Sequence, residues 1–91
     1  MSDIDYSRLP LHMQDSARDY IEKGVAPGPF LTNLITNNLY WTLAYADDDN
    51  VAALREWREW IRAIPFPAWG SSTHLDAWIS KGGNGGEEPA A

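Results

Sequence analysis

A row of neutral hydrogen-bonding side chains is the part of this sequence best suited to binding chemistry. The row consists of Thr32, Thr36, Asn37 and Asn38. Tyr20 lies one predicted helix earlier, and a tyrosine ring can stack on a nucleotide base while hydroxyl and amide groups bind base edges and phosphate oxygens. The same residues also fit simple packing, with Thr and Asn between close helices and Tyr20 at the edge of the core. From these residues alone, packing is the preferred interpretation.

The other polar features give weaker indications of a site. A helix that starts after Gly28 could present free N–H groups to a phosphate, although Pro29 removes one donor and a plain helix start is the simpler interpretation. His12 and His74 are isolated in the sequence and are interpreted as surface residues rather than metal ligands. The aspartates at 47–49 lack the spacing of a calcium loop and fit a helix cap better. We therefore predict no metal and no cofactor.

Signatures of catalysis are missing from the chain. The sequence contains no Walker-type phosphate loop, no nucleophile elbow and no metalloprotease histidine pair. No nucleophile with its base, and no set of metal ligands, can be assembled from these residues. We predict that the protein is not an enzyme.

Size and composition favour one domain that associates with something else. The chain has 91 residues, which corresponds to one domain, and 44% of them are hydrophobic. Its five tryptophans are Trp41, Trp57, Trp60, Trp69 and Trp78. Because each buried aromatic side chain covers roughly 150–250 Å², a monomer of four helices can hardly enclose them all. We expect some of this surface to meet another subunit or a ligand with flat faces.

The charge of the chain excludes several classes of partner. The formal net charge is −6 and the pI is about 4.6, which argues against binding to DNA or RNA polymers or to anionic membranes. Cysteine is absent, so neither disulfides nor cysteine metal sites are expected. The first residues lack the pattern of a signal peptide, and no apolar run approaches the roughly 20 residues that span a bilayer. We expect a cytoplasmic protein.

Hydrophobic periodicity predicts an all-α fold. The expected structure is a compact bundle of about four helices, over residues 9–23, 29–46, 49–64 and 73–80. Residues 1–8 are polar and are predicted to be flexible, and residues 9–82 are predicted to form a single helical domain. The Gly-rich acidic residues 83–91 are predicted to be disordered.

The predicted helix over 29–46 has an unusual composition. It is apolar on most sides, and no charged residue occurs between Lys23 and Asp47. A helix of this kind is central to its fold or to its assembly. We therefore expect it to be buried between copies of the protein, in a homo-oligomer.

A set of short motifs occurs in order along the chain. These are Tyr20-Ile21-Glu22-Lys23-Gly24-Val25, Pro27-Gly28-Pro29-Phe30-Leu31, Leu34-Ile35-Thr36-Asn37-Asn38-Leu39, Ala44-Tyr45-Ala46-Asp47, Asn50 and Trp69-Gly70-Ser71. Taken together, their order and spacing resemble a family of small phage proteins, the anti-CBASS sponges that sequester cyclic oligonucleotide messengers of bacterial immunity. The likeness covers about residues 17–82.

The resemblance implies a compact helical protein that assembles into a hexamer in the infected bacterial host. Such proteins bind cyclic dinucleotides, such as 3′,3′-cyclic GMP-AMP, in pockets shared by two protomers, and some also bind cyclic trinucleotides. They trap the messenger without cleaving it. By this resemblance Tyr20 would stack on a base, and Thr36, Asn37 and Asn38 would supply the polar contacts.

The sequence departs from the family pattern in its charge. No Lys or Arg occurs within 29–46, so the contact with phosphate would have to come from Lys23, Arg18, Arg8 or another subunit. The negative net charge also opposes a ligand with two phosphates at long range.

A different function also fits the acidic composition. The protein could inhibit a basic host defence or nucleic-acid-binding protein by direct contact, in which case the aspartates at 47–49, with Glu56 and Glu59, would matter more than Tyr20. A purely structural oligomer is a third interpretation.

Overall fold

The computed structural model describes residues 4–85, and every regular element within this range is a helix. The elements are α1 (Leu11–Lys23), α2 (Pro29–Ile35), α3 (Leu39–Tyr45), α4 (Asp48–Ala52), α5 (Leu54–Ala63), the 3-10 helix η1 (Phe66–Ala68), α6 (Ser72–Lys81) and the 3-10 helix η2 (Gly83–Gly85). The predicted all-α class is therefore confirmed, with more and shorter helices than expected. None of these helices is long and apolar enough to cross a membrane.

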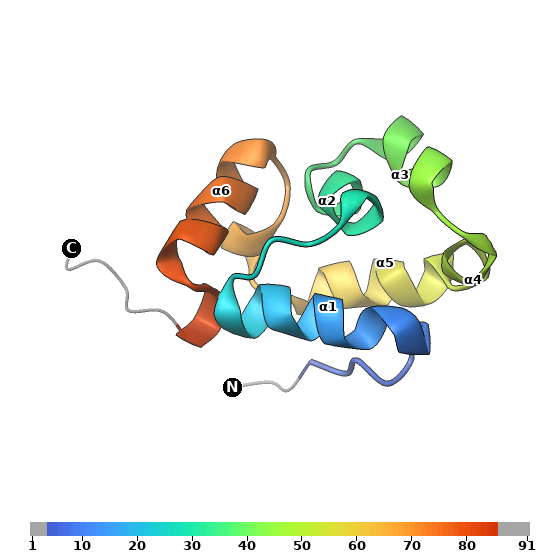
Figure 1. Ribbon diagram of the computed structural model, residues 1–91, viewed down its shortest axis with the longest axis horizontal. Coiled ribbons are helices and arrows are strands. Elements are labelled where there is room, and N and C mark those ends of the chain that lie inside the picture. Colours follow the sequence, from blue (N-terminus) through green and yellow to red (C-terminus); the bar gives the residue numbers. More distant parts are fainter. Residues whose placement is uncertain (1–3, 86–91) are drawn as a thin grey trace.

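The helices are arranged around one shared core (Figure 1). In this view α1 and α5 run lengthwise along one side, α2 and α3 lie across from them, and α6 and α4 lie toward opposite ends. Residue contacts join α2 to both α3 and α6, and join α1 to η2. The chain thus returns to α1 in its last described turn.

Aromatic side chains fill the centre of the core. Trp57 is fully buried, and its ring centroid lies 5.3 Å from that of Phe30 and 5.4 Å from that of Trp60. The indole N–H of Trp57 donates to the amide oxygen of Asn50 at 3.1 Å, which satisfies a polar group that is costly to bury alone. The remaining core residues are Tyr6, Leu9, Ala17, Tyr20, Ile21, Leu31, Ile35, Ile64, Ala68, Leu75 and Trp78.

The single helix predicted over 29–46 is wrong, because two helices replace it. Asn37 has a φ of 65°, in the left-handed region that asparagine tolerates better than most residues. Its N–H donates to the carbonyl of Leu34 at 3.3 Å, and the N–H of Asn38 donates to the carbonyl of Asn33 at 2.9 Å. This pair of bonds is the Schellman motif, which ends α2 and starts α3 in a new direction.

The helix predicted over 49–64 is divided as well. Ala53, with φ −102° and ψ 18°, separates α4 from α5, and the two helices point in different directions in Figure 1. The helix cap predicted for the aspartates is confirmed at Asp47, whose Oδ1 accepts the N–H of Asn50 at 2.8 Å. The third predicted helix therefore starts close to its expected place but is bent after one turn.

The first and last predicted helices are observed close to their expected bounds. α1 begins at Leu11 because Pro10 occupies the cap position, and it ends where Gly24 takes a φ of 69°. α6 begins one residue early, and the hydroxyl of Ser71 accepts the N–H of His74 at 3.1 Å. In both helices the residues that start or end the helix lie directly at its ends in the sequence.

The N-terminal segment contributes to the core, contrary to prediction. Tyr6 and Leu9 are only 8% and 3% exposed, and Ile4 packs partly against the same cluster. The segment predicted to be flexible thus holds two side chains that pack on the core, Ile4 and Tyr6, while residues 1–3 lie outside the described residues.

The predicted disordered tail also begins inside the fold. Gly83–Gly85 form η2, which packs against α1. A Cβ atom placed on Gly83 would lie 2.6 Å from the backbone nitrogen of Gly24, so the two backbones touch. Disorder is therefore wrong for 83–85, and residues 86–91 lie outside the described range.

Candidate functional site

A cluster of large apolar side chains on α3 remains exposed. Its members are Leu39, Tyr40, Trp41, Leu43 and Tyr45, which are between 47% and 72% exposed. We call this surface the α3 face. Thr42 points the other way: its side chain is buried, and its hydroxyl donates to the carbonyl of Asn38 at 2.7 Å. α3 therefore packs on the domain through a small residue and presents its aromatic residues to solvent.

The aromatic rings of the α3 face contact one another. The ring of Trp41 lies 5.0 Å from that of Tyr40, nearly perpendicular to it, and 6.0 Å from that of Tyr45. Trp and Tyr are enriched in the energetically important parts of protein interfaces, and their flat faces also stack on nucleotide bases. The chemistry of this surface is contact and stacking, because its five side chains are all aromatic or aliphatic.

The exposure of α3 follows from the turn at Asn37. A continuous helix would have kept α3 in line with α2, whose Phe30, Leu31 and Ile35 are buried. The left-handed turn sends α3 out of that line, so its apolar residues leave the core. The signal was present in the sequence as the Asn37-Asn38 pair, which suits a helix C-terminus.

The structure removes the stacking role predicted for Tyr20. The side chain is fully buried, and its hydroxyl donates to the carbonyl of Ala68 at 2.6 Å. Burial also raises the pKa of Tyr20 far above its usual value. A ring held inside the core in this way is not accessible to a base, so the packing interpretation is correct for Tyr20.

The two threonines of the predicted polar row direct their hydroxyl protons to the local backbone. The hydroxyl of Thr36 donates to the carbonyl of Thr32 at 2.8 Å, and that of Thr32 donates to the carbonyl of Pro27 at 3.1 Å. Asn37 and Asn38 differ from them because both are exposed in the turn between α2 and α3. Of the polar row, the two asparagines are therefore the residues best exposed to a ligand.

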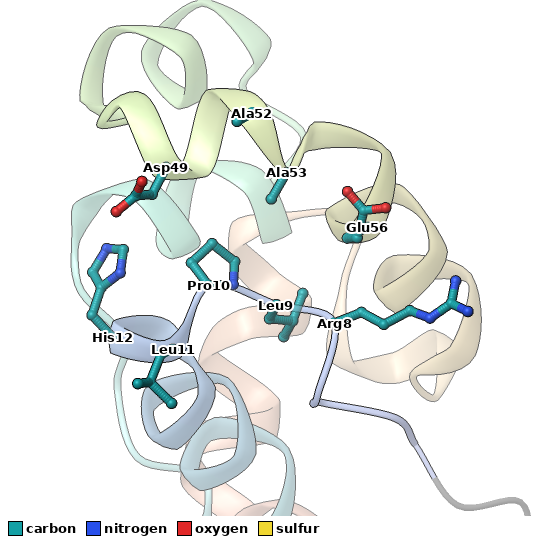
Figure 2. A pocket seen from close by; sticks show the side chains of 9 residues that line it. All are labelled: Arg8, Leu9, Pro10, Leu11, His12, Asp49, Ala52, Ala53 and Glu56. Atoms are coloured by element: carbon teal, nitrogen blue, oxygen red, sulfur yellow. The ribbon is translucent and has the colours of Figure 1, made fainter.

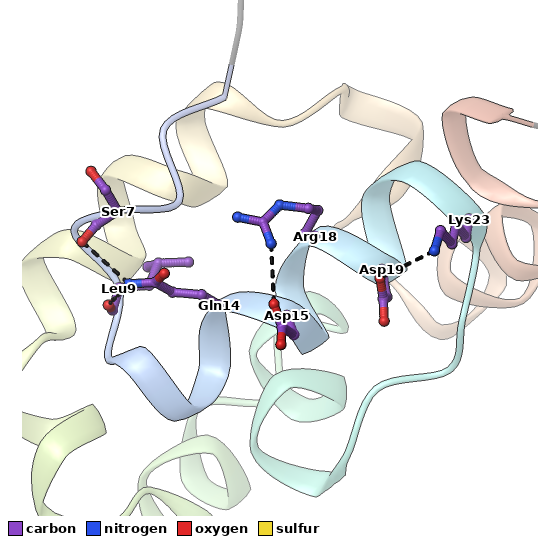
Figure 3. Close-up of polar contacts among 7 residues, drawn as sticks. All are labelled: Ser7, Leu9, Gln14, Asp15, Arg18, Asp19 and Lys23. Atoms are coloured by element: carbon purple, nitrogen blue, oxygen red, sulfur yellow. Dashed lines mark hydrogen bonds and ion pairs between the residues drawn. The ribbon is translucent and has the colours of Figure 1, made fainter.

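Of the three cations named for the phosphate contact, Arg18 and Lys23 lie on α1 and pair along it (Figure 3). Arg18 Nη1 lies 3.1 Å from Asp15 Oδ1, and Lys23 Nζ lies 3.9 Å from Asp19 Oδ1. A cavity of about 400 Å³ is lined by Asn37, but by neither of these two cations. The structure thus does not bring the predicted basic and polar residues together in this cavity.

A second cavity lies where the start of α1 faces α4 and α5 (Figure 2). It has a volume of about 610 Å³, and its ionisable residues are Arg8, His12, Asp49 and Glu56. In Figure 2, His12 lies toward Asp49 and Arg8 lies toward Glu56, with apolar side chains between them. Because both signs of charge alternate around it, this cavity has no clear preference for an anion or a cation.

His12 has a structural partner beside this cavity. Its Nε2 lies 2.8 Å from Oδ2 of Asp47, and both side chains are about half exposed. The backbone hydrogen bond from Asn50, followed by the hydrogen bond from His12, lowers the pKa of Asp47. Residues 4–85 hold no group of three or more metal-ligating side chains placed to bind an ion.

Comparison with known proteins identifies no relative of this chain. No protein family, no curated protein and no solved structure matches the chain. The fold and the surfaces described above define a small all-α domain with an exposed aromatic helix. Its functional assignment therefore depends on its own residues.

Proposed function

We propose that this protein binds and sequesters a cyclic oligonucleotide second messenger without cleaving it, as an oligomer in the cytoplasm of a phage-infected bacterium. The observation that carries the proposal is the α3 face, a set of exposed aromatic rings in a stretch of chain without charges. The motifs that resemble the anti-CBASS sponges supply the class of ligand. The α3 rings take over the stacking role that the buried Tyr20 cannot perform.

A second copy of the chain is the partner that best fits the α3 face. In a two-fold dimer a surface patch packs against the identical patch of the other copy. Because the protein has a net charge of −6, two acidic patches placed together in this way would repel each other. The α3 face escapes this repulsion because no charged residue occurs between Lys23 and Asp47. Its aromatic and aliphatic side chains also have the composition of an interface core.

A seam between two copies suits the proposed ligand. A cyclic dinucleotide is nearly two-fold symmetric, and a two-fold dimer presents each of its groups twice. Exposed rings on both copies can stack on the bases, which contributes on the order of 1–3 kcal/mol per base. Asn37 and Asn38 stand exposed just before α3, where their amides can reach base edges or phosphate oxygens.

Titration calorimetry tests this function directly. The purified protein is titrated with 3′,3′-cyclic GMP-AMP and with other cyclic di- and trinucleotides. We expect binding of at least one of them, and recovery of the intact ligand after the complex is denatured by heat. The absence of heat with every ligand would remove the proposal, and recovery of a linear product would replace sequestration with hydrolysis.

A second candidate function is inhibition of a basic host protein by direct contact. The observation that favours it is that the exposed acidic residues Asp47, Asp48 and Asp49 follow the α3 face in the sequence after one residue, Ala46. An apolar patch next to an acidic rim suits a partner with an apolar patch and a basic rim. This function predicts indifference to nucleotides, and weaker partner binding when Asp48 and Asp49 are both changed to Asn, with the Asp47 cap left intact.

A further inference from the structure

The cavity of about 400 Å³ beside α5 combines apolar and cationic groups. Trp57, Ile61 and Trp69 contribute to its apolar wall, while Asn37, Arg58 and Arg62 supply its polar groups. Ligand pockets in proteins have volumes of roughly 300–1,000 Å³ and the same mixture of apolar walls with a few polar groups. The cavity is therefore large enough for one ring system, and too small for a whole oligonucleotide.

Helix geometry places both arginines on one side of the cavity. Arg58 and Arg62 are four residues apart on α5, so their side chains share a face of the helix. Both contact Glu59: Arg58 Nε lies 3.1 Å and Arg62 Nη1 lies 3.5 Å from its Oε2. Exposed ion pairs of this kind contribute little, so a phosphate can compete with the carboxylate for the guanidinium groups.

Trp69 is held in the cavity wall by the loop that carries it. The N–H of Gly70 donates to the carbonyl of Ile35 at 2.7 Å, which ties this loop to the end of α2. Nδ1 of His74 donates to the carbonyl of Trp69 at 2.7 Å. Trp69 is half-buried against the core, and its own N–H donates to the carbonyl of Phe66 at 3.2 Å, so its backbone is fixed on both sides.

Asn37 lines the cavity from the turn between α2 and α3. Its left-handed backbone is fixed by the Schellman bonds that end α2, so the turn determines where its side chain begins. A primary amide donates and accepts, which suits the edge of a heterocyclic ring.

We infer that this cavity binds a planar aromatic ring that carries a phosphate, with the ring against Trp69 and the phosphate on Arg58 and Arg62. The amide of Asn37 bonds the edge of the ring. The inference rests on the proposed function for its ligand class, and it deepens that function by locating one nucleotide unit in each copy, with Trp69 in place of the α3 rings as the surface on which that unit stacks. It also supplies the phosphate contact that residues 29–46 lack, from α5 instead of α1.

The charges of the cavity favour this class of ligand over others. Two guanidinium groups and one carboxylate leave a net positive charge beside the apolar wall, in a chain whose overall charge is −6. A cation would be repelled at this position, and a neutral apolar molecule would gain nothing from the arginines. A bidentate guanidinium also matches the geometry of a phosphate.

The experiment compares three probes in titration calorimetry: 3′,3′-cyclic GMP-AMP, guanosine 5′-monophosphate and guanosine. We expect Arg58→Gln and Arg62→Gln each to weaken binding of the two phosphate-bearing probes about tenfold or more. Guanosine should bind more weakly than the monophosphate and should not respond to these substitutions. Arg55→Gln is the matched control, because Arg55 is exposed on α5 but does not line the cavity.

A variant at Asn37 tests the contact with the edge of the ring and leaves both arginines unchanged. Asn37→Gly removes the amide and keeps a residue that accepts a positive φ, so the turn is preserved. We expect weaker binding of both phosphate-bearing probes with no loss of thermal stability. Unchanged binding in Asn37→Gly would remove the role of its amide.

The outcomes separate the cavity from the proposed function. Tight binding of 3′,3′-cyclic GMP-AMP that is indifferent to both arginine substitutions would overturn the inference and leave the function standing. Binding of guanosine 5′-monophosphate that depends on the arginines, without binding of any cyclic oligonucleotide, would support the cavity and remove the function. Binding of none of the three probes would overturn the inference, and the absence of heat with every other cyclic di- and trinucleotide as well would remove the function.

Discussion

Two buried tyrosines differ in one hydrogen bond, and the difference can be measured. The hydroxyl of Tyr20 donates to the carbonyl of Ala68 at 2.6 Å, whereas the buried hydroxyl of Tyr6 has no partner among the described residues. Tyr20→Phe should lower the free energy of unfolding by about 1–3 kcal/mol, because it leaves the buried carbonyl unpaired. Tyr6→Phe should not lower it and should raise it, since it loses no bond and removes an unpaired buried hydroxyl. Urea unfolding followed by fluorescence measures both.

The same pair of variants distinguishes a core role from a ligand role. If Tyr20 stacked on a base through its ring, Tyr20→Phe would keep the ring and the fold would lose nothing. A stability loss in Tyr20→Phe, absent from Tyr6→Phe, marks the hydrogen bond inside the core. Equal stability of the two variants would contradict the buried position of the Tyr20 hydroxyl.

At the scale of elements, α1 and η2 are joined by two glycines in direct backbone contact. Gly24 and Gly83 have φ values of 69° and 66°, and a Cβ on Gly24 would lie 2.7 Å from the backbone nitrogen of Gly83. Gly24→Ala and Gly83→Ala should each destabilise the fold by more than the roughly 1–2 kcal/mol of a left-handed alanine, because backbone atoms must also move apart. Thermal unfolding by circular dichroism is the measurement.

Gly28→Ala is the matched control for these glycines. Gly28 follows Gly24 in the same connection between α1 and α2, has a φ of −74°, and has open space around the position of a Cβ. We expect its thermal midpoint to stay close to that of the wild type. A Gly28 variant as unstable as the other two would show that the loss comes from chain flexibility and not from the contact between α1 and η2.

The elements that were predicted well are those with local signals at their ends. Pro10 and Gly24 bound α1, and Ser71 starts α6, so a sequence of a few residues suffices in each case. The break at Ala53 has no such signal, because alanine is the best helix former. We attribute it to packing, since the neighbouring Asn50 is buried and bonded to a core tryptophan.

The candidate site was harder to predict than the helix ends because it depends on contacts and turns that no local signal at a helix end encodes. The burial of Tyr20 depends on Ala68, which is 48 residues away in the sequence, and no periodicity within one helix encodes that contact. The exposure of the α3 rings depends on a single left-handed residue, Asn37. Of the polar contacts predicted around these residues, Asn37 and Asn38 are the ones that are exposed.

At the scale of the whole molecule, the acidic surface and the neutral α3 face have opposite effects on association. The acidic surface repels a second copy of the protein, and the α3 face is the surface that can bind one. A net charge of −6 keeps copies apart at long range, and salt screens that repulsion. The aromatic residues of α3 carry no charge, so salt does not weaken contacts between them. Association between copies through these residues should therefore strengthen as added salt screens the repulsion. Association through charged surfaces of opposite sign would weaken instead.

Substitutions on α3 test whether this face joins two copies. Trp41→Gln combined with Tyr45→Gln should reduce the mass in sedimentation toward that of the 10.2 kDa monomer, because both side chains are about half exposed and their loss spares the core. Leu11→Gln is the control, since Leu11 is 84% exposed and lies outside the α3 face. A ligand held in the seam would bind the assembled form more tightly, so adding it should raise the mass of the wild type at a fixed protein concentration. A wild type that sediments as a monomer with and without ligand, or a Leu11 variant that dissociates as readily, would exclude α3 as the seam.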